Sequence, residues 1–195
     1  MANEVRLLFF AGSTRRGSLN KKLARAAHAA AQAQGFAGDF LDLADYPMPL
    51  YDGDLEAVEG PPEAARRLKA TFERYQGIFI ASPEYNASFP PLLKNALDWV
   101  TRVRAEGEPA LQVYKTRVFA LGAASAGAYG GIRGLIGLRQ TLTIGMGALV
   151  LSEQVAVGGA DKSLGDDGTL NDERSASLLN AVVKRLGETA SRFPA

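Results

Sequence analysis

The sequence contains no cysteine and a single histidine, and both facts limit the chemistry that the chain can carry. Without cysteine, disulfides, zinc–thiolate sites, thiol nucleophiles and iron–sulfur clusters held by the chain are excluded. His28 lies in an alanine-rich helical stretch, which favours a place on a helix face over a catalytic role. A cluster of histidine ligands is impossible, and we expect no metal site. If the chain is an enzyme, we expect a bound cofactor to supply the reactive chemistry.

The chain also lacks a long apolar run and a marked net charge. No stretch approaches the roughly 20 apolar residues that span a bilayer, and the N-terminus leads into a strand without a signal-peptide pattern. A formal net charge of +1 gives no general case for nucleic acid or an anionic membrane as partner. With 47% apolar and 22% charged residues, the composition is ordinary for a globular protein. We therefore expect one domain spanning residues 1–195, located in the cytoplasm.

Apolar runs and helical patterns alternate along the chain. The runs predict five strands, at residues 5–11, 39–43, 77–81, 117–124 and 148–157. The helical patterns cover roughly residues 19–34, 61–75, 91–104, 132–144 and the stretch from 171 onward. Residues 44–60 contain several prolines and are expected to form an irregular loop. This alternation predicts βαβ units and a parallel sheet of order 2-1-3-4-5, whose first, third and fourth turns meet at one edge.

The turn after the first strand, residues 10–20, has the composition of an anion-binding loop. It holds two glycines, three hydroxyl residues, two arginines and an asparagine. Glycines let the backbone approach a ligand, and amides at a helix start point their N–H groups at it. Gly12 and Gly17 have the spacing of a triphosphate loop, but Ser18-Leu19 stands where Lys-Ser/Thr is required. We interpret the turn as a cradle for one phosphate; an ordinary glycine- and serine-rich turn is the alternative.

The other two turns offer different chemistry. Residues 83–86 supply an aromatic face, a rigid backbone and the polar side chains of Glu84 and Asn86. Residues 125–131 supply backbone amides without bulky side chains. A planar heteroaromatic ring tethered to one phosphate would use all three turns. FMN has that anatomy, and the residues alone do not choose it over another mononucleotide.

Two motifs resemble the NADPH-dependent FMN reductase family of flavodoxin-like proteins, which includes quinone, chromate and azo-dye reductases. The motifs are residues 12–20 (GSTRRGSLN) and residues 83–88 (PEYNAS) followed by 93–99 (LKNALDW). Residues 125–127 (SAG), 130–131 (GG) and 138–140 (LRQ) support the resemblance, which covers nearly the whole chain. One departure is Ala87, where many relatives have glycine. If this position needs a positive φ, the local turn must differ slightly.

The resemblance implies an α/β fold, a flavodoxin-like three-layer sandwich with a five-stranded parallel sheet and helices on both faces. It implies that the FMN phosphate is surrounded by Ser13, Arg15, Ser18, Leu19 and Asn20. It also implies that the isoalloxazine is lined by Pro83, Glu84, Tyr85 and Asn86. The other edge of the ring would be approached by Ser125 and Gly127.

The reaction that the resemblance implies has two steps. NADPH or NADH reduces the bound FMN and leaves, and a small-molecule acceptor then takes the electrons at the same face. An open cleft would admit quinones, azo compounds, metal oxyanions or free flavin. One alternative is a flavodoxin-type electron carrier without NAD(P)H turnover, although such carriers tend to be strongly acidic. Another is a chain that kept the fold and lost the flavin.

The helix at residues 91–104 carries two apolar stripes. One comprises Leu93, Leu97 and Val100; the other comprises Leu92, Ala96, Trp99 and Val103. The helix at residues 132–144 is also apolar on more than one face. Since one face suffices to cover a sheet, we expect a homodimer or homotetramer. A wider interface within the chain is the alternative.

Overall fold

The computed structural model describes residues 5–165 and 167–193; residues 1–4, expected to lead into the first strand, lie outside that range. Five parallel strands form one sheet in the order β2-β1-β3-β4-β5. The strands are β1 (Arg6–Ala11), β2 (Ala37–Leu41), β3 (Gly77–Ala81), β4 (Val118–Ala124) and β5 (Leu149–Val157). The predicted flavodoxin-like fold class is confirmed.

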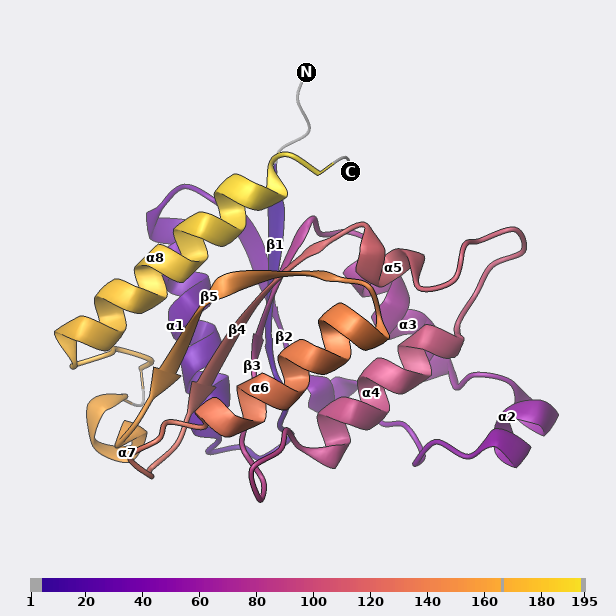
Figure 1. Cartoon of the computed structure of the whole chain (residues 1–195), viewed down its shortest axis with the longest axis horizontal. Helices are drawn as coiled ribbons and strands as arrows, with labels where there is room; N and C mark the ends of the chain where they lie inside the picture. Colours follow the sequence, from indigo (N-terminus) through magenta and orange to yellow (C-terminus); the bar gives the residue numbers. More distant parts are fainter. Residues whose placement is uncertain (1–4, 166, 194–195) are drawn as a thin grey trace.

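Helices cover both faces of the sheet (Figure 1). The longer helices are α1 (Leu19–Ala33), α3 (Glu63–Phe72), α4 (Pro91–Arg102), α6 (Ile132–Gln140) and α8 (Glu173–Ala190). The short ones are α2 (Gly53–Glu59), α5 (Gln112–Lys115) and α7 (Ala160–Ser163), with a 3-10 turn at Leu43–Asp45 and a π-helical turn at Thr141–Gly145. Among the described residues, no helix is long and apolar enough to cross a bilayer.

Successive strand residues point to opposite faces and divide the core in two. In β1, Leu8 and Phe10 pack with α3, α4 and α6, whereas Leu7 and Phe9 pack with α1 and α8. All four side chains are buried. His28 lies on a face of α1, where its Nε2 is 2.9 Å from the carbonyl oxygen of Gly38. The prediction of a helix-face histidine is confirmed.

The expectation that residues 44–60 are irregular was wrong in part. The 3-10 turn and α2 both fall in this stretch. Asp52 caps α2 by accepting hydrogen bonds from the N–H groups of Asp54 and Leu55, and Gly60 follows its end with a φ of 71°. None of its seven residues is buried, so α2 lacks the apolar periodicity that predicts a helix.

The second apolar stripe of α4 is covered in part by the chain itself, at Ala96 and Trp99. Trp99 is fully buried, and its Nε1 donates a hydrogen bond of 2.8 Å to the carbonyl oxygen of Pro49. The ring of Tyr51 packs edge-on against Trp99, with 5.0 Å between the ring centroids. Asn95 donates to the same carbonyl and accepts from the Tyr51 N–H. The segment at residues 49–51 therefore accounts for the burial of Trp99 without a subunit interface, whereas Leu92 of the same stripe is 39% exposed.

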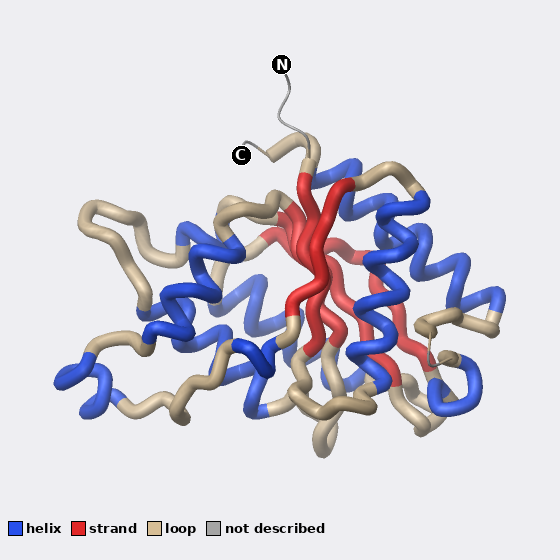
Figure 2. The backbone as a smooth tube through the Cα atoms, turned by 180° about the vertical axis from the view of Figure 1, so that it is seen from behind, coloured by secondary structure: helices blue, strands red, loops and turns tan. Residues whose placement is uncertain are grey.

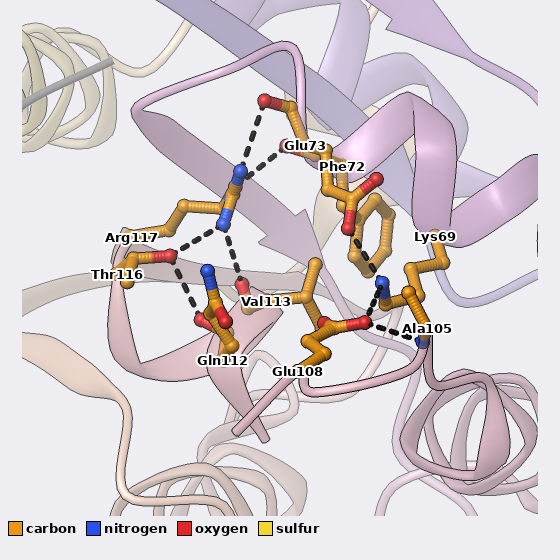
Figure 3. Close-up of polar contacts among 9 residues, drawn as sticks. All are labelled: Lys69, Phe72, Glu73, Ala105, Glu108, Gln112, Val113, Thr116 and Arg117. Carbon is orange, nitrogen blue, oxygen red and sulfur yellow. Dashed lines mark hydrogen bonds and ion pairs between the residues drawn. The ribbon is translucent and has the colours of Figure 1, made fainter. Parts of the chain in front are cut away.

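A buried lysine ties the loop at residues 103–111 to α3 (Figure 3). The Nζ of Lys69 lies 2.6 Å from Oε1 of Glu73 and 2.8 Å from Oε2 of Glu108. Glu108 also accepts a hydrogen bond from the N–H of Ala105. Beside this cluster, Arg117 donates to the carbonyl oxygens of Phe72 and Glu73 at the end of α3. Long-range side-chain contacts thus hold a segment that has little regular structure.

Candidate functional site

The turns that follow β1, β3 and β4 lie side by side at the carboxyl ends of these strands, at the lower edge of the molecule in Figures 1 and 2. The N–H of Gly12 donates to the carbonyl oxygen of Ala81 at 2.9 Å, and the N–H of Ser82 donates to that of Gly122 at 2.7 Å. These bonds continue the sheet past the strand ends. The predicted convergence of the three turns is confirmed, at the place where open α/β sheets bind ligands.

The first turn presents backbone N–H groups that have no partner among the described residues. Ser13 and Ser18 are buried, whereas residues 14–17 are exposed. In the part of the chain that the structure describes, no acceptor faces the N–H groups of Thr14, Arg16, Gly17, Leu19 and Asn20. Free amides at a helix N-terminus attract anions, and the first turn of α1 contains no acidic residue to occupy them.

The cradle has room for a small anion. A Cβ added at Gly17 would meet no atom within 4 Å outside the two neighbouring residues. The space beside this turn is therefore open. The side chains of Arg15 and Arg16 are exposed beside it. Buried hydroxyls, free amides and guanidinium groups together match the chemistry of a phosphate monoester.

The side chain of Asn20 is bonded to the backbone at the end of β4. Its Nδ2 donates to the carbonyl oxygen of Ala124, and its Oδ1 accepts from the N–H of the same residue, both at 2.9 Å. The carboxamide is buried and holds the first turn of α1 against the end of β4. The backbone N–H of Asn20 remains available to an anion.

The second turn is a tight hairpin. Tyr85 and Ser88 exchange two backbone hydrogen bonds, of 2.8 and 3.0 Å, around Asn86 and Ala87. The φ values of Asn86 and Ala87 are 50° and 65°, which is the pattern of a type I′ turn. The position of Ala87 therefore does require a positive φ. Ala87 adopts this conformation despite its Cβ.

Glu84 joins this hairpin to α6. Its carboxylate accepts hydrogen bonds from the N–H groups of Arg133 and Gly134 and from Nε of Arg133, at 3.0, 3.1 and 2.7 Å. Burial acts to raise the pKa of Glu84, but the bonds from Arg133 and the Gly134 amide outweigh it and lower the pKa. The side chain thus stabilises the start of α6. Because the carboxylate is bonded to α6, the backbone of Glu84 is the part that can line a ring.

The third turn is shaped by glycine. Gly130 and Gly131 have φ values of 60° and 86°, and a side chain at Gly130 would lie 2.8 Å from the backbone of Val157. The Oγ of Ser125 accepts a hydrogen bond from the N–H of Gly127, and the next residues to Tyr129 are exposed. On the side of the hairpin, this turn therefore exposes mainly backbone atoms.

The structure also places two side chains behind the first turn whose positions the sequence did not reveal. Lys21 donates to the carbonyl oxygen of Thr14 and forms an ion pair with Asp42. Asp42 follows β2, and nothing in the local sequence pattern links it to this lysine.

Comparisons with known proteins agree with this geometry. The model of the NADPH-dependent FMN reductase family matches residues 5–162. The chain is 30% identical to a quinone reductase of Escherichia coli (strain K12), with 98% of each chain covered. It is 31% identical to an NAD(P)H-dependent FMN reductase of Pseudomonas aeruginosa, with 95% of each covered. Among solved structures, a flavoenzyme NAD(P)H:(acceptor) oxidoreductase from Paracoccus denitrificans is similar, with a TM-score of 0.77, 27% identity and coverage of 97% and 98%.

Proposed function

This chain belongs to the NADPH-dependent FMN reductase family, and from that premise we propose that it passes electrons from NAD(P)H through bound FMN to quinones. Membership makes the chain an oxidoreductase with FMN as cofactor and NAD(P)H as reductant. The single observation that carries the proposal is the set of backbone N–H groups in the first turn that have no partner among the described residues, beside the turns that follow β3 and β4. Quinones come first among acceptors because curated relatives are named for them.

In this proposal the first turn holds the phosphate. Ser13 and Ser18 offer hydroxyl groups, Arg15 offers its guanidinium group, and Leu19 and Asn20 offer backbone N–H groups. A phosphate here would also lie on the axis of α1, where the helix dipole favours negative charge. These hydroxyl, guanidinium and N–H groups can hold a single phosphate without a metal ion.

The hairpin and the third turn line the ring. Pro83, Glu84, Tyr85 and Asn86 supply a rigid surface on one side, and Ser125 and Gly127 approach the opposite edge. When bound, FMN accepts a hydride from NAD(P)H and passes electrons to the acceptor. The chain's own contribution is orientation, since the strained hairpin fixes the surface against which the ring packs. The side chain of Tyr85 is 57% exposed on this hairpin.

The proposal is tested with the purified protein. Flavin absorbance, FMN titration and an anaerobic titration with NADPH, followed by addition of a quinone, examine each step in turn. We expect FMN binding, reduction by NADPH and reoxidation by the quinone. Azo dyes, chromate and free FMN offered in the same assay define how broad the acceptor range is.

The flavodoxin-type carrier remains the second candidate, because it would use the same cradle. The net charge of +1 opposes it, since such carriers tend to be strongly acidic. A protein that binds FMN but oxidises no NADPH or NADH with any acceptor would support the carrier. A chain that takes up no FMN would instead have lost the cofactor.

We also propose a homodimer or homotetramer, now on the evidence of α6 rather than α4. Ile136 and Ile144 are 63% and 80% exposed at α6 and the π-helical turn that follows it. Ile144 lines an open groove of about 670 Å³, together with Phe89, Leu111 and Met146. Sedimentation is expected to show a species larger than 20.7 kDa, and Ile144→Glu is expected to dissociate it. A monomer at micromolar concentration would refute the assembly.

Two further expectations belong to this proposal. Residues 1–195 form one domain, which a single cooperative unfolding transition would support and two separate transitions would contradict. The protein acts in the cytoplasm, where its reductant NAD(P)H is produced. Cell fractionation tests the location directly.

A further inference from the structure

Lys21 is a buried lysine in the first turn of α1. Its side chain is 4% exposed, and its Nζ lies 2.7 Å from Oδ2 of Asp42 and 3.2 Å from the carbonyl oxygen of Thr14. A buried ammonium group is costly unless it is paired, and a positive charge near a helix N-terminus opposes the helix dipole. The helix dipole therefore does not explain a lysine at this position of α1. The two contacts of the Lys21 ammonium group explain it.

The contact with Thr14 fixes the orientation of one peptide group in the cradle. Because the peptide group is planar and trans, its carbonyl and its N–H point in opposite directions. With the Thr14 carbonyl held by Lys21, the N–H of Arg15 faces the other way and lies 3.3 Å from Oγ of Ser13. If this peptide turned over, its carbonyl oxygen would face the anion and repel it.

The contact with Asp42 fixes the lysine itself. Oδ1 of Asp42 accepts a hydrogen bond from the N–H of Ala44 at 3.0 Å, which leaves Oδ2 aimed at Lys21. The neighbouring residue Asn20 holds the same helix turn to Ala124 at the end of β4. The start of α1 is thus tied to the segment after β2 on one side and to β4 on the other.

We propose that Lys21 is a positioning residue that makes the cradle selective for a phosphate without touching it. The inference rests on FMN as the ligand, as proposed above. It assigns Lys21 to the orientation of the Thr14–Arg15 peptide group, so that the Arg15 N–H bonds Oγ of Ser13 and the Thr14 carbonyl oxygen is held away from the cradle. The ring-binding turns, which Lys21 does not contact, are left unchanged.

Riboflavin, which lacks the phosphate, separates this role from general support of the fold. Dissociation constants for FMN and riboflavin are measured by quenching of flavin fluorescence in the wild-type protein and in Lys21→Met. We expect the FMN affinity to fall about tenfold or more, while the riboflavin affinity stays within about twofold. A general structural defect would weaken both ligands together, and an unchanged ratio of the two constants would overturn the proposal.

Two further variants sharpen the test. Lys21→Gln removes the charge but keeps an N–H donor for the Thr14 carbonyl, so we expect part of the selectivity to return. If Lys21→Met does not fold, the comparison uses Lys21→Gln, whose selectivity must then lie below that of the wild type. Arg25→Met removes a positive charge from α1 at a residue that lies over the ring of Phe40, 4.5 Å from its centroid. Equal loss of selectivity in Arg25→Met would show that net charge, and not peptide orientation, is responsible.

The failure of this inference can be told from the failure of the proposed function. If the wild-type protein binds neither flavin, the proposed function fails and the inference fails with it. If the wild-type protein prefers FMN to riboflavin and Lys21→Met keeps the full preference, only the inference fails.

Discussion

Ala87 holds a backbone conformation that its side chain disfavours. Its φ of 65° lies in the left-handed region, next to Asn86 at 50°. For a residue with a Cβ this region costs roughly 1–2 kcal/mol, whereas glycine enters it freely. The two hydrogen bonds between Tyr85 and Ser88 impose the turn and thus offset the strain. Strain of this kind is common in loops that line binding sites.

Replacing Ala87 by glycine is expected to stabilise the protein. Relief of strain is offset in part by the greater freedom of glycine in the unfolded chain, which leaves a gain of about 0.5–1 kcal/mol. Urea denaturation of the apoprotein measures the change. Ala126→Gly is the matched control, since Ala126 is exposed and does not have a positive φ, and it should not stabilise. A lower stability for Ala87→Gly than for the control would contradict the strain at this position.

Arg15 is expected to contribute to FMN binding and not to turnover. Loss of charge-assisted hydrogen bonds in Arg15→Ala should weaken FMN affinity roughly 10- to 100-fold. Turnover at saturating FMN should change little, because we propose that the ring binds at the other two turns. Arg16→Ala is the control with the same charge change, and we expect a smaller effect. The assignment fails if Arg15→Ala lowers turnover at saturating FMN but leaves affinity intact.

Single residues also show where sequence patterns stop being informative. The composition of the first turn predicted an anion cradle, and the free amides agree with it. The partners of Asn20 and Glu84 were not predictable, because they lie 104 and 49 residues away in the chain. Residue type suggests that such a side chain binds something. It does not say whether the partner is a ligand or a distant backbone group.

At the scale of elements, the loop at residues 103–111 depends on the ion pair between Lys69 and Glu108. Burial alone would lower the pKa of Lys69, but hydrogen bonds to Glu108 and Glu73 outweigh it and raise the pKa. Burial likewise acts to raise the pKa of Glu108, and the N–H of Ala105 together with Lys69 lowers it. A lowered carboxylate pKa stabilises the fold above the ordinary value of 4.5, and this stability is lost as the pH falls through the lowered value.

Lys69→Met is expected to release this loop. The substitution leaves the carboxylate of Glu108 partly buried without its cation, so the loop should open more often than the rest of the fold. Limited trypsin digestion near pH 8 should then cleave after Arg104 several-fold faster. Lys94→Met is the control, because its ion pair with Asp98 is exposed and lies within α4. Equal cleavage rates at Arg104 in the two variants would show that the loop does not depend on Lys69.

The elements that sequence patterns predicted are those with a buried face. Strands β3 and β4 are wholly buried and were predicted closely, as was α1 with its alanine stripe. Helices α2 and α5 were missed, since α2 buries none of its residues and α5 has only four. In α4 the second apolar stripe is buried only at Ala96 and Trp99, and the pattern did not reveal that Trp99 finds its partner at Pro49.

At the scale of the whole molecule, Tyr75 links three elements at the edge of the sheet. It follows α3, its hydroxyl donates to Oδ2 of Asp39 in β2 at 2.7 Å, and Arg6 of β1 contacts the same oxygen at 2.8 Å. Burial, followed by the contact with Asp39, raises the pKa of Tyr75 to about 12. The bond from Tyr75, followed by the nearby Arg6, lowers the pKa of Asp39.

These shifts predict how global stability depends on alkaline pH. A tyrosine whose pKa rises from 10.0 in the unfolded chain to about 12 in the fold contributes stability that is fully present below pH 10.0. That contribution is lost as the pH rises through about 12, because ionised Tyr75 would face the carboxylate of Asp39. Urea denaturation at several pH values should show this loss in the wild-type protein. Tyr75→Phe should be less stable than wild type at pH 8 but should lose less between pH 10 and 12. Tyr129→Phe, at a residue 71% exposed, should follow the wild-type curve, and an identical curve for Tyr75→Phe would disprove the link.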